Sequence, residues 1–338
     1  MRVLVTGGTG FVGSHTVESI RAAGHDVRLL VRDPDKARRV FASRGVEADD
    51  LVVGDVTDAA CVDRALEDCE AVVHAAALVA LEAARAEEVL ATNARGVEIV
   101  VGGAVRRGVR SIVYVSSGSA LFTPGTGSIG PGSAIATGTS AYARSKADSE
   151  RIVQRLQEAG APIRSTYPPG IIGPADPGLS EGNHTIRTFL RDTMVVTSGG
   201  FQVVDVRDLA AVHAALLEPD VPAGRYTIGG PMLDWIALIE LMDELTGRRV
   251  RRFRIPGSAL RGLGRLGDLV KRVRPFDFPL TREGMQFATR WPGILSSPTL
   301  GSLGVRFREA RETYADTIRW LHRAGHLTSE QAGRLAEP

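Results

Sequence analysis

Short apolar runs alternate with longer segments of helical periodicity through the first half of the chain. Strands that are apolar throughout and separated by helices are typical of a parallel sheet covered on both faces. The pattern therefore predicts an α/β fold with a doubly wound, parallel sheet of the Rossmann type. The apolar runs cover residues 3–5, 27–31, 51–53, 71–73, 111–115 and 163–167, and the helical segments cover 11–23, 35–42, 59–66, 87–107 and 141–158.

The pattern becomes irregular after residue 174. A run at 201–206 and a helical segment at 208–217 indicate a return to the main sheet and one more covering helix. Beyond residue 222 the mixture suits a smaller C-terminal α+β domain, with strands at 225–228 and 250–255 and helices at 233–246, 258–273 and 309–323. We expect a large domain of residues 1–172 with about 201–220, and a cap domain of residues 173–200 with 221–338.

The first apolar run leads directly into a glycine-rich loop, Gly7-Gly8-Thr9-Gly10-Phe11-Val12-Gly13, and then into an apolar helix. Gly7 allows a tight turn, Gly10 allows the backbone to approach a pyrophosphate, and Gly13 allows the helix to pack close to the strand. The helix N-terminus adds amide donors and the positive end of its dipole. The loop predicts a dinucleotide site that also contacts Thr9, Phe11 and Val12, so the large domain would bind the cofactor and the cap the substrate.

The second apolar run ends in Arg32-Asp33. NAD sites usually place a carboxylate at this strand end to accept from the ribose 2′-hydroxyl, whereas a guanidinium suits a 2′-phosphate. Arg32 therefore favours NADP. Asp33 keeps NAD open, because a carboxylate one residue further along also reaches a ribose. The alternative for Arg32 is a solvated charge at the start of a helix.

The next two strand ends carry further candidate cofactor contacts. Asp55, followed by Val56, would accept a hydrogen bond from an adenine amino group; alternatively it caps the next helix. After the run at 71–73, the small residues Ala75, Ala76 and Ala77 leave room for a cofactor across the strand ends. We expect His74, beside them, to pack or hydrogen-bond rather than to catalyse.

Tyr142 and Lys146 are four residues apart on an expected helix, so their side chains share one face. Lysine is scarce in the chain, with three among 338 residues, so this spacing is an uncommon coincidence. A free phenol has a pKa near ~10, and an adjacent ammonium lowers it towards neutral pH. Beside a bound dinucleotide, the pair indicates hydride transfer coupled to proton transfer.

A segment rich in Gly, Ser, Thr and Pro covers residues 117–140 and interrupts the alternation of strands and helices. Long loops inside a compact domain are usually functional. We interpret the segment as a flap over the substrate; the alternative is a solvated surface loop.

Eight motifs occur in the order found in the extended short-chain dehydrogenase/reductase family, which the chain resembles from residue 1 to about 217 and more loosely to Trp320. The resemblance is greatest to the dihydroflavonol-reductase-like and nucleotide-sugar-epimerase-like branches. The motifs lie at residues 6–13, 54–55, 74–77, 92–96, 115–117, 142–146, 173–174 and 205–210.

The resemblance implies roles for the matching residues. Tyr142 would be the acid/base and Lys146 its partner, which also holds the nicotinamide ribose. Ser117 would hydrogen-bond the substrate oxygen, with Ser116 and Ser119 as fallbacks. Asn93 would lie on the helix that positions the site, and Pro168 would lie near the nicotinamide. The resemblance also implies a homodimer built on the helices at 87–107 and 141–158.

Two positions depart from the family pattern. Both lie in the segment at 167–174, which contains two adjacent prolines and ends in Gly-Pro. Many relatives carry Arg before the first Pro of this segment and Tyr before its last Gly-Pro, where this chain has Tyr167 and Ile172. The departures put the substrate side in doubt more than the cofactor side. We expect an apolar Ile172 to make a pocket less suited to a sugar hydroxyl.

These features lead to three alternative functions. The first is an NADP-dependent oxidoreductase acting on a ketone, an aldehyde or a secondary alcohol. The second is a nucleotide-sugar epimerase or dehydratase with tightly bound NAD. The third is a dinucleotide-sensing regulator, which the Tyr142–Lys146 pair counts against.

Composition excludes several other classes of protein. The formal net charge is only +2, so we expect a small-molecule substrate and no nucleic-acid partner. The two cysteines have no metal-binding spacing, so we expect no metal. The sequence shows neither a signal peptide nor an apolar run long enough to span a bilayer, which indicates a cytoplasmic protein. The amphipathic segment at 258–273 either packs on its own domain, as we expect, or lies on a membrane surface.

Overall fold

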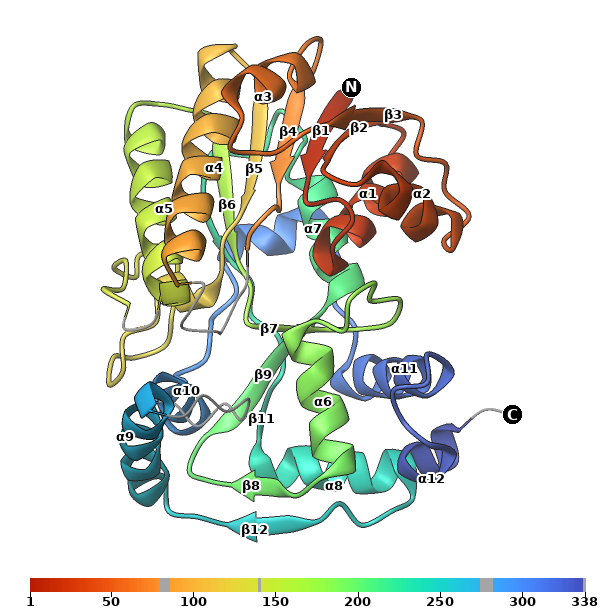
Figure 1. Cartoon of the computed structure of the whole chain (residues 1–338), viewed down its shortest axis with the longest axis vertical. Helices are drawn as coiled ribbons and strands as arrows, with labels where there is room; N and C mark the ends of the chain where they lie inside the picture. Colours follow the sequence, from red (N-terminus) through yellow and green to blue (C-terminus); the bar gives the residue numbers. More distant parts are fainter. Residues whose placement is uncertain (79–85, 139–140, 274–281, 337–338) are drawn as a thin grey trace.

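Seven parallel strands form the central sheet, in the order β10-β6-β5-β4-β1-β2-β3 (Figure 1). The computed structural model describes residues 1–78, 86–138, 141–273 and 282–336. The strands of this sheet are β1 (Arg2–Thr6), β2 (Asp26–Val31), β3 (Asp50–Val53), β4 (Ala71–His74), β5 (Ser111–Val115), β6 (Ile163–Tyr167) and β10 (Gly224–Thr227).

Helices cover both faces of this sheet, because alternate residues of each strand point to opposite sides. Val3 and Val5 of β1 pack with a layer formed by α1 (Phe11–Ala22), α2 (Pro34–Ala42) and α7 (Val206–Ala215). Leu4, between them, packs with the opposite layer, formed by α3 (Ala59–Ala65), α4 (Ala86–Arg106) and α5 (Ala141–Glu158). The predicted doubly wound α/β fold is confirmed, and the five helices expected in the first half agree with the structure to within one residue at each end.

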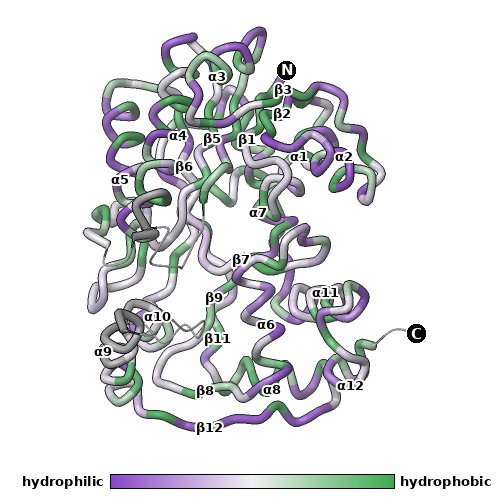
Figure 2. Tube along the Cα trace, in the orientation of Figure 1, coloured by the Kyte–Doolittle hydropathy of each residue, from purple (hydrophilic) through white to green (hydrophobic). Residues whose placement is uncertain are grey.

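A smaller unit lies below this sheet in the view of Figure 1. It contains a three-stranded sheet of β7 (Gly170–Ile172), β9 (Gly200–Asp205) and β11 (Met232–Asp234), and a pair formed by β8 (Met194–Val196) and β12 (Arg252–Arg254). Figure 2 shows hydrophilic positions at β12, where Arg252 and Arg254 flank the apolar Phe253, and all three side chains are exposed. The helices of this cap are α6 (Glu181–Arg191), α8 (Trp235–Thr246), α9 (Gly257–Val273), α10 (Arg282–Arg290), α11 (Ala310–Arg323) and α12 (Ser329–Ala332).

Two strands lie in different sheets from those that the sequence pattern indicated. β9 pairs with β7 and β11 rather than with the main sheet, whereas β10 is the edge strand of the main sheet, beside β6. β9 resembles a main-sheet strand in sequence because it is buried on both sides: Val203 packs in the cap core and Val204 in the core of the large domain. The expected return to the main sheet at 201–206 is therefore wrong, although α7 does cover that sheet.

Candidate active site

The glycine loop between β1 and α1 has the backbone geometry that a dinucleotide requires. Gly7 has a φ of +75°, and a Cβ on it would lie 2.6 Å from the backbone nitrogen of Ala76. Gly10 is the N-cap of α1 and donates its amide to the Gly7 carbonyl at 3.0 Å. A Cβ on Gly10 would lie 3.3 Å from that carbonyl oxygen. Among the described residues, no other atom would lie within 4 Å of it. The side of Gly10 that faces away from this oxygen leaves room for a pyrophosphate at the helix N-terminus.

Gly13 has a different neighbour from the one that the sequence suggested. A Cβ on Gly13 would lie 2.1 Å from the Gly7 carbonyl oxygen, so this glycine lets α1 pack against the turn rather than against the strand. Thr9 lies in the same turn, and Phe11 and Val12 begin α1. These residues are placed where a dinucleotide at the helix N-terminus would contact them, and their binding role stays a prediction.

The segment after β4 crosses the end of β1 and lies against this loop. Ala75 donates its amide to the Thr6 carbonyl at 3.1 Å, and Ala76 donates to the Thr6 hydroxyl at 3.4 Å. Ala77 follows and is exposed. His74 is buried, bonds the Thr6 hydroxyl through Nδ1 at 2.7 Å and stacks on a tyrosine ring. Burial, with the charge of Lys146, lowers the pKa of His74 to about 3, so it is a neutral packing residue, as expected.

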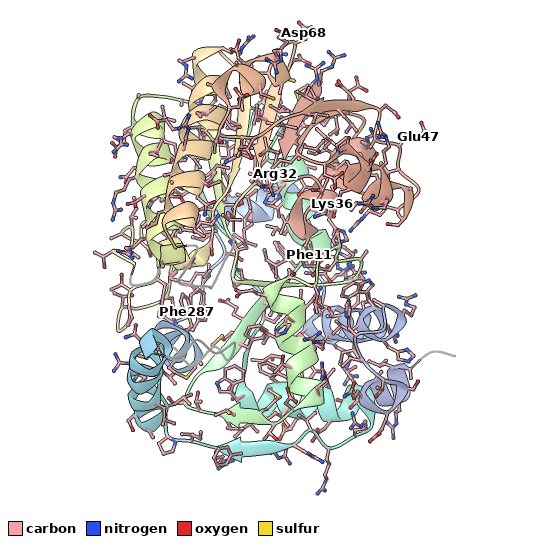
Figure 3. The ribbon with its side chains drawn as sticks, viewed as in Figure 1. Phe11, Arg32, Lys36, Glu47, Asp68 and Phe287 are labelled. Carbon is pink, nitrogen blue, oxygen red and sulfur yellow. The ribbon has the colours of Figure 1, made fainter. Side chains whose placement is uncertain are left out.

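Arg32 follows β2, and its guanidinium is exposed. Asp33, the competing candidate, is the N-cap of α2: its Oδ1 accepts from the Lys36 amide at 2.9 Å, and its Oδ2 lies 3.9 Å from Arg39. The helix cap is therefore formed by Asp33 and not by Arg32. Figure 3 shows Arg32 and Lys36 on the same side of the large domain as Phe11.

Asp55 follows β3 and does not cap a helix. Its Oδ1 accepts from the amide and the hydroxyl of Thr57, at 2.9 and 2.7 Å, whereas Asp58 caps α3. Partial burial tends to raise the pKa of Asp55, but the Thr57 bonds and the charge of Arg32 outweigh it and lower that pKa. Val56 is partly buried and packs close to Gly96 of α4. Asp55 therefore favours the ionised form, and within the described residues its Oδ2 has no hydrogen-bond donor; its contact with an adenine stays a prediction.

Ser117 lies just beyond the end of β5 and is partly buried. Its Oγ accepts from the Ser119 amide at 3.2 Å and from the Ser119 hydroxyl at 3.0 Å. Among the described residues, none accepts the Ser117 hydroxyl hydrogen. Two donors thus orient this hydroxyl and leave its hydrogen available to a substrate oxygen. Ser119 supports Ser117, and Ser116 is buried and bonded elsewhere, so Ser117 is the better placed of the three serines.

Helix α5 carries Tyr142 and Lys146, as the spacing predicts. The side chain of Tyr142 lies outside the described part of the chain. Lys146 is buried, and burial lowers its pKa to about 8, while the Glu150 carboxylate acts in the opposite direction. Asn93 of α4 accepts from the Leu78 amide at 2.7 Å and donates to the Ser145 hydroxyl at 3.1 Å. It thereby holds the segment after β4 against α5, which is the positioning place that the resemblance implies.

The two departures from the family pattern are both enclosed side chains. Tyr167, at the end of β6, is fully buried and donates its hydroxyl hydrogen to the Glu150 carboxylate. Ile172 is also fully buried and packs in the cap core. The expectation that Ile172 makes a pocket less suited to a sugar is therefore wrong, because its side chain is enclosed by the cap. Pro168 is buried and accepts from the Gly118 amide at 2.9 Å, which fixes it beside Ser117.

An aromatic cluster that the sequence did not reveal lies beside Ser117. It consists of Phe122, Phe287 and Trp291, whose ring centroids are 4.5 to 5.5 Å apart. A Cβ on Gly118 would come within 3.0 Å of the Trp291 ring, so this ring lies against the residue after Ser117. Figure 3 shows Phe287 at the edge of the cap that faces the large domain. No sequence signal connects these residues, because about 165 positions separate the first from the others.

The segment after Ser117 is packed more firmly than a loose flap. Ile129 is buried, and its amide and carbonyl bond the cap backbone at Gly293 and Leu295, at 2.9 and 2.8 Å. The Ala136 amide donates to the Ala120 carbonyl at 2.8 Å. Residues 139–140 lie outside the described part. The segment thus connects the large domain to the cap, and its role over a substrate stays a prediction.

The candidate site combines strand ends, a glycine loop and a buried lysine on α5. These features define the class of nucleotide-binding enzymes with a doubly wound sheet. The chain belongs to the NAD dependent epimerase/dehydratase family, whose model matches residues 3–229. Together with its relatives, this match places it among the extended short-chain dehydrogenases/reductases, as the sequence motifs indicate.

Relatives of this chain include reductases and epimerases. It is 29% identical to "Sterol demethylase protein B" of Methylococcus capsulatus, over 97% of this chain and 100% of that protein. It is 25% identical to a "Putative dihydroflavonol 4-reductase" of Synechocystis, over 96% of each chain. A UDP-glucose-4-epimerase from Stenotrophomonas maltophila, solved with NAD and formylated UDP-arabinopyranose, superposes with a TM-score of 0.76 over 96% of this chain and 99% of that one; at 20% identity it shows the shared fold.

The amphipathic segment at 258–273 falls in α9, which packs against α10. Within the described residues, none of the helices combines the length and the apolar character needed to cross a membrane. Leu260 is buried whereas Leu263 is exposed, so only part of the apolar stripe is covered where the side chains are described. That α9 packs on its own domain therefore stays a prediction, with contact with a membrane surface as the alternative.

Proposed function

We propose that the protein is an NADP-preferring oxidoreductase that reduces a ketone or an aldehyde, or oxidises a secondary alcohol. One observation carries the proposal. The Ser117 hydroxyl has an available hydrogen, and the buried Lys146 lies on α5, the helix that follows Ser117. Ser117 lies at the same end of the main sheet as the glycine loop. A hydrogen-bond donor and a fixed cation at a dinucleotide site suit a carbonyl oxygen that gains negative charge.

The chain's own residues account for the proton chemistry. A bound nicotinamide would supply or accept the hydride. In the reductive direction, Tyr142 would donate its phenolic proton to the substrate oxygen, and Ser117 would steady that oxygen by donating its hydroxyl hydrogen. Lys146 would lower the pKa of the phenol through its positive charge. In the oxidative direction, Tyr142 would accept the proton from the alcohol.

The preference for NADP is inferred from the charges after β2. Arg32 is exposed and its charge lowers the pKa of Asp55, which supports a guanidinium near the expected adenosine end of the site. Asp33, the one carboxylate that would favour NAD, already accepts the α2 cap bond. A 2′-phosphate would therefore contact Arg32, and Lys36 lies four residues further along the chain, in the first turn of α2.

We infer that the substrate carbonyl is part of an apolar, ring-bearing molecule. The partly buried rings of Phe287 and Trp291 lie beside Ser117, and flat apolar rings stack well on aromatic side chains. The polar side chain next to them, Gln202, already uses its amide to bond Trp291 and the backbone of Ile294, so it offers little to sugar hydroxyls. The names of the two relatives above, a sterol demethylase protein and a dihydroflavonol reductase, also refer to ring compounds.

Titration of the purified protein with NADPH and NADH, followed by a panel of carbonyl compounds, tests this proposal. We expect tighter binding of NADPH and oxidation of NADPH with ring-bearing ketones rather than with small aliphatic aldehydes. Equal affinity for the two cofactors would contradict the NADP preference. No turnover with any carbonyl or alcohol in the panel would contradict the reaction.

The second candidate is a nucleotide-sugar epimerase or dehydratase, which the family match favours. In such an enzyme the cofactor would be reduced and reoxidised within one cycle and would stay bound. Protein that is purified with NAD, and that releases UMP-type or TDP-type nucleotides on denaturation, would favour this candidate over the first.

The resemblance also leads us to propose a homodimer built on α4 and α5, which lie side by side on one outer face of the large domain (Figure 1). Analytical ultracentrifugation at micromolar concentration tests it, and a mass near 36.0 kDa would show a monomer instead.

A further inference from the structure

A buried carboxylate lies behind the candidate site, outside the roles assigned so far. Glu150 of α5 is 0% exposed. Its Oε1 accepts from the Tyr167 hydroxyl and, at 3.4 Å, from the Arg225 guanidinium. Its Oε2 accepts from the Ser116 hydroxyl at 3.1 Å. The three donors come from three strands of the main sheet. Tyr167 lies on β6, Arg225 lies on β10, and Ser116 directly follows β5.

The contacts of Glu150 fit an ionised carboxylate. Its three partners all donate to it, and the Arg225 guanidinium can only donate. Burial raises the pKa of Glu150, and it outweighs Tyr167, Arg225, Ser116 and Lys146, which lower that pKa. Burial beside Glu150 raises the pKa of Tyr167, so its phenol keeps the proton that it donates. The three donors stabilise the ionised form of this buried carboxylate against the cost of burial.

Arg225 supplies the positive charge that the family pattern would place at position 167. It lies on β10, the strand next to β6, with its guanidinium carbon 5.7 Å from the centre of the Tyr167 ring. It also donates to the Ser133 carbonyl at 2.8 Å, which fixes its direction. The tyrosine and the arginine on neighbouring strands therefore hold the carboxylate jointly.

Three members of this network lie close in the chain to residues of the candidate site. Glu150 is one helical turn from Lys146 and two turns from Tyr142. Ser116 precedes Ser117, and Tyr167 precedes Pro168. The charge of Glu150 raises the pKa of Lys146 against the effect of burial, and His74 of β4, which Lys146 also affects, is neutral.

We propose that Glu150, held by Tyr167, Ser116 and Arg225, is a positioning residue: a buried counter-ion that keeps Lys146 charged and fixes α5 against the strand ends that carry Ser117 and Pro168. The inference rests on the proposed function only for its effect on turnover. Its effect on Lys146 exists in the protein without substrate or cofactor.

Direct titration of Lys146 by NMR tests the proposal, because the chain has only three lysines, Lys36, Lys146 and Lys271. In protein labelled with ¹³C at lysine Cε, we expect Lys146 to titrate near pH 8. Glu150→Gln keeps the size of the side chain and removes its charge, so the midpoint should fall by about one pH unit, a tenfold change in acidity. The matched control is Glu158→Gln, an exposed glutamate on the same helix, which should leave the midpoint unchanged.

A second variant keeps the test decisive if Glu150→Gln does not fold. Tyr167→Phe preserves the ring and the carboxylate but removes one donor, and it should lower the Lys146 midpoint in the same direction by a smaller amount. In the active enzyme, the pH above which turnover falls should move down together with that midpoint. A folded variant whose Lys146 titrates at the wild-type pH would overturn the proposal. A shifted Lys146 in a protein that reduces no carbonyl would leave it standing and refute the proposed function alone.

Discussion

At the residue scale, neighbouring glycines of the loop differ in what surrounds them. Gly10 has open space beside it at the start of α1, whereas Gly13 is in contact with the Gly7 carbonyl. The sequence predicted the loop and its cofactor role from glycine spacing alone. The spacing also predicted that Gly10 faces the ligand and Gly13 serves the packing. It could not show that Gly13 packs against the Gly7 carbonyl rather than the strand, because that depends on the path of the backbone around Gly7.

Alanine at these two positions should therefore give different results. Gly10→Ala should keep the thermal midpoint of the protein within a few degrees and weaken dinucleotide binding at least ~10-fold, because the methyl group occupies the approach of the pyrophosphate. Gly13→Ala should lower stability by about 2 kcal/mol or more through the overlap with Gly7. Thermal melts and cofactor titrations of both variants check this, and Gly262→Ala, a helical position with no described atom within 4 Å of a new Cβ, is the control. Unaltered binding by Gly10→Ala would argue against the loop as the pyrophosphate site.

Arg32 carries the second residue-scale prediction. A charge-assisted bond from its guanidinium to a 2′-phosphate is worth about 1.5–3 kcal/mol, so Arg32→Ala should weaken NADPH binding by about 10-fold to 150-fold and leave NADH binding nearly unchanged. Arg38→Ala, an exposed arginine on α2 that pairs with Asp35 at 2.7 Å, should affect neither cofactor. Isothermal titration with both cofactors measures the difference. An equal loss of affinity for NADH and NADPH would show that Arg32 does not contact the 2′-phosphate.

At the scale of elements, α5 and the strand ends that precede it form the site, and the rest of the chain positions them. Helix periodicity predicted the bounds of α5 correctly, and with them the spacing of Tyr142 and Lys146 on one helix. The sheet to which β9 and β10 belong could not be predicted. A strand that is buried between two domain cores has the same apolar pattern as one in the middle of a single sheet. The aromatic cluster was missed for a related reason, since only the tertiary fold brings Phe122 to α10.

Gln202 of β9 connects this strand to the segment after α10. It is buried, donates to the carbonyls of Gly230 and Ile294 at 2.9 Å each, and accepts from the Trp291 indole at 3.1 Å and the Ile294 amide at 2.7 Å. Gln202→Leu should therefore lower the free energy of unfolding by on the order of 2–4 kcal/mol, because several buried polar groups lose their partner. Urea unfolding measures the loss, with Gln154→Leu on the surface of α5 as the control. A change within about 0.5 kcal/mol, as expected for the control, would mean that these bonds contribute little.

At the scale of the whole molecule, three buried histidines couple folding to pH. Burial is the first cause of a lowered pKa in each: about 4 for His15, which also faces Arg44, and about 3 for His74 and His213. His213 of α7 bonds the Thr16 hydroxyl of α1 at 3.0 Å and the Thr166 hydroxyl of β6 at 3.1 Å, and His15 bonds the Pro174 carbonyl at 3.0 Å. These neutral rings therefore connect several elements in the folded state.

Stability should consequently fall as the pH drops below 6.5. The unfolded chain binds a proton at each of these histidines near pH 6.5, whereas the folded chain does so only near pH 3 to 4, so the unfolded state gains protons first. Each histidine should cost about 2 kcal/mol between pH 6.5 and 5, at 1.36 kcal/mol per pH unit. The carboxyls with raised pKa, Glu150, Glu181 and Asp208, offset part of this loss. Urea midpoints at pH 7 and pH 5 check the prediction, and equal midpoints would refute it.

The central claim is that Tyr142 transfers the proton that accompanies hydride transfer. The most direct measurement is single-turnover transfer of deuterium from 4-deuterated NADPH to a ketone substrate, in the wild-type enzyme and in Tyr142→Phe. We predict deuterium on the carbinol carbon of the product in the wild type, and a rate about 10²-fold to 10⁴-fold lower in the variant with the Kd for NADPH unchanged. Transfer at a near-normal rate by Tyr142→Phe would contradict the claim.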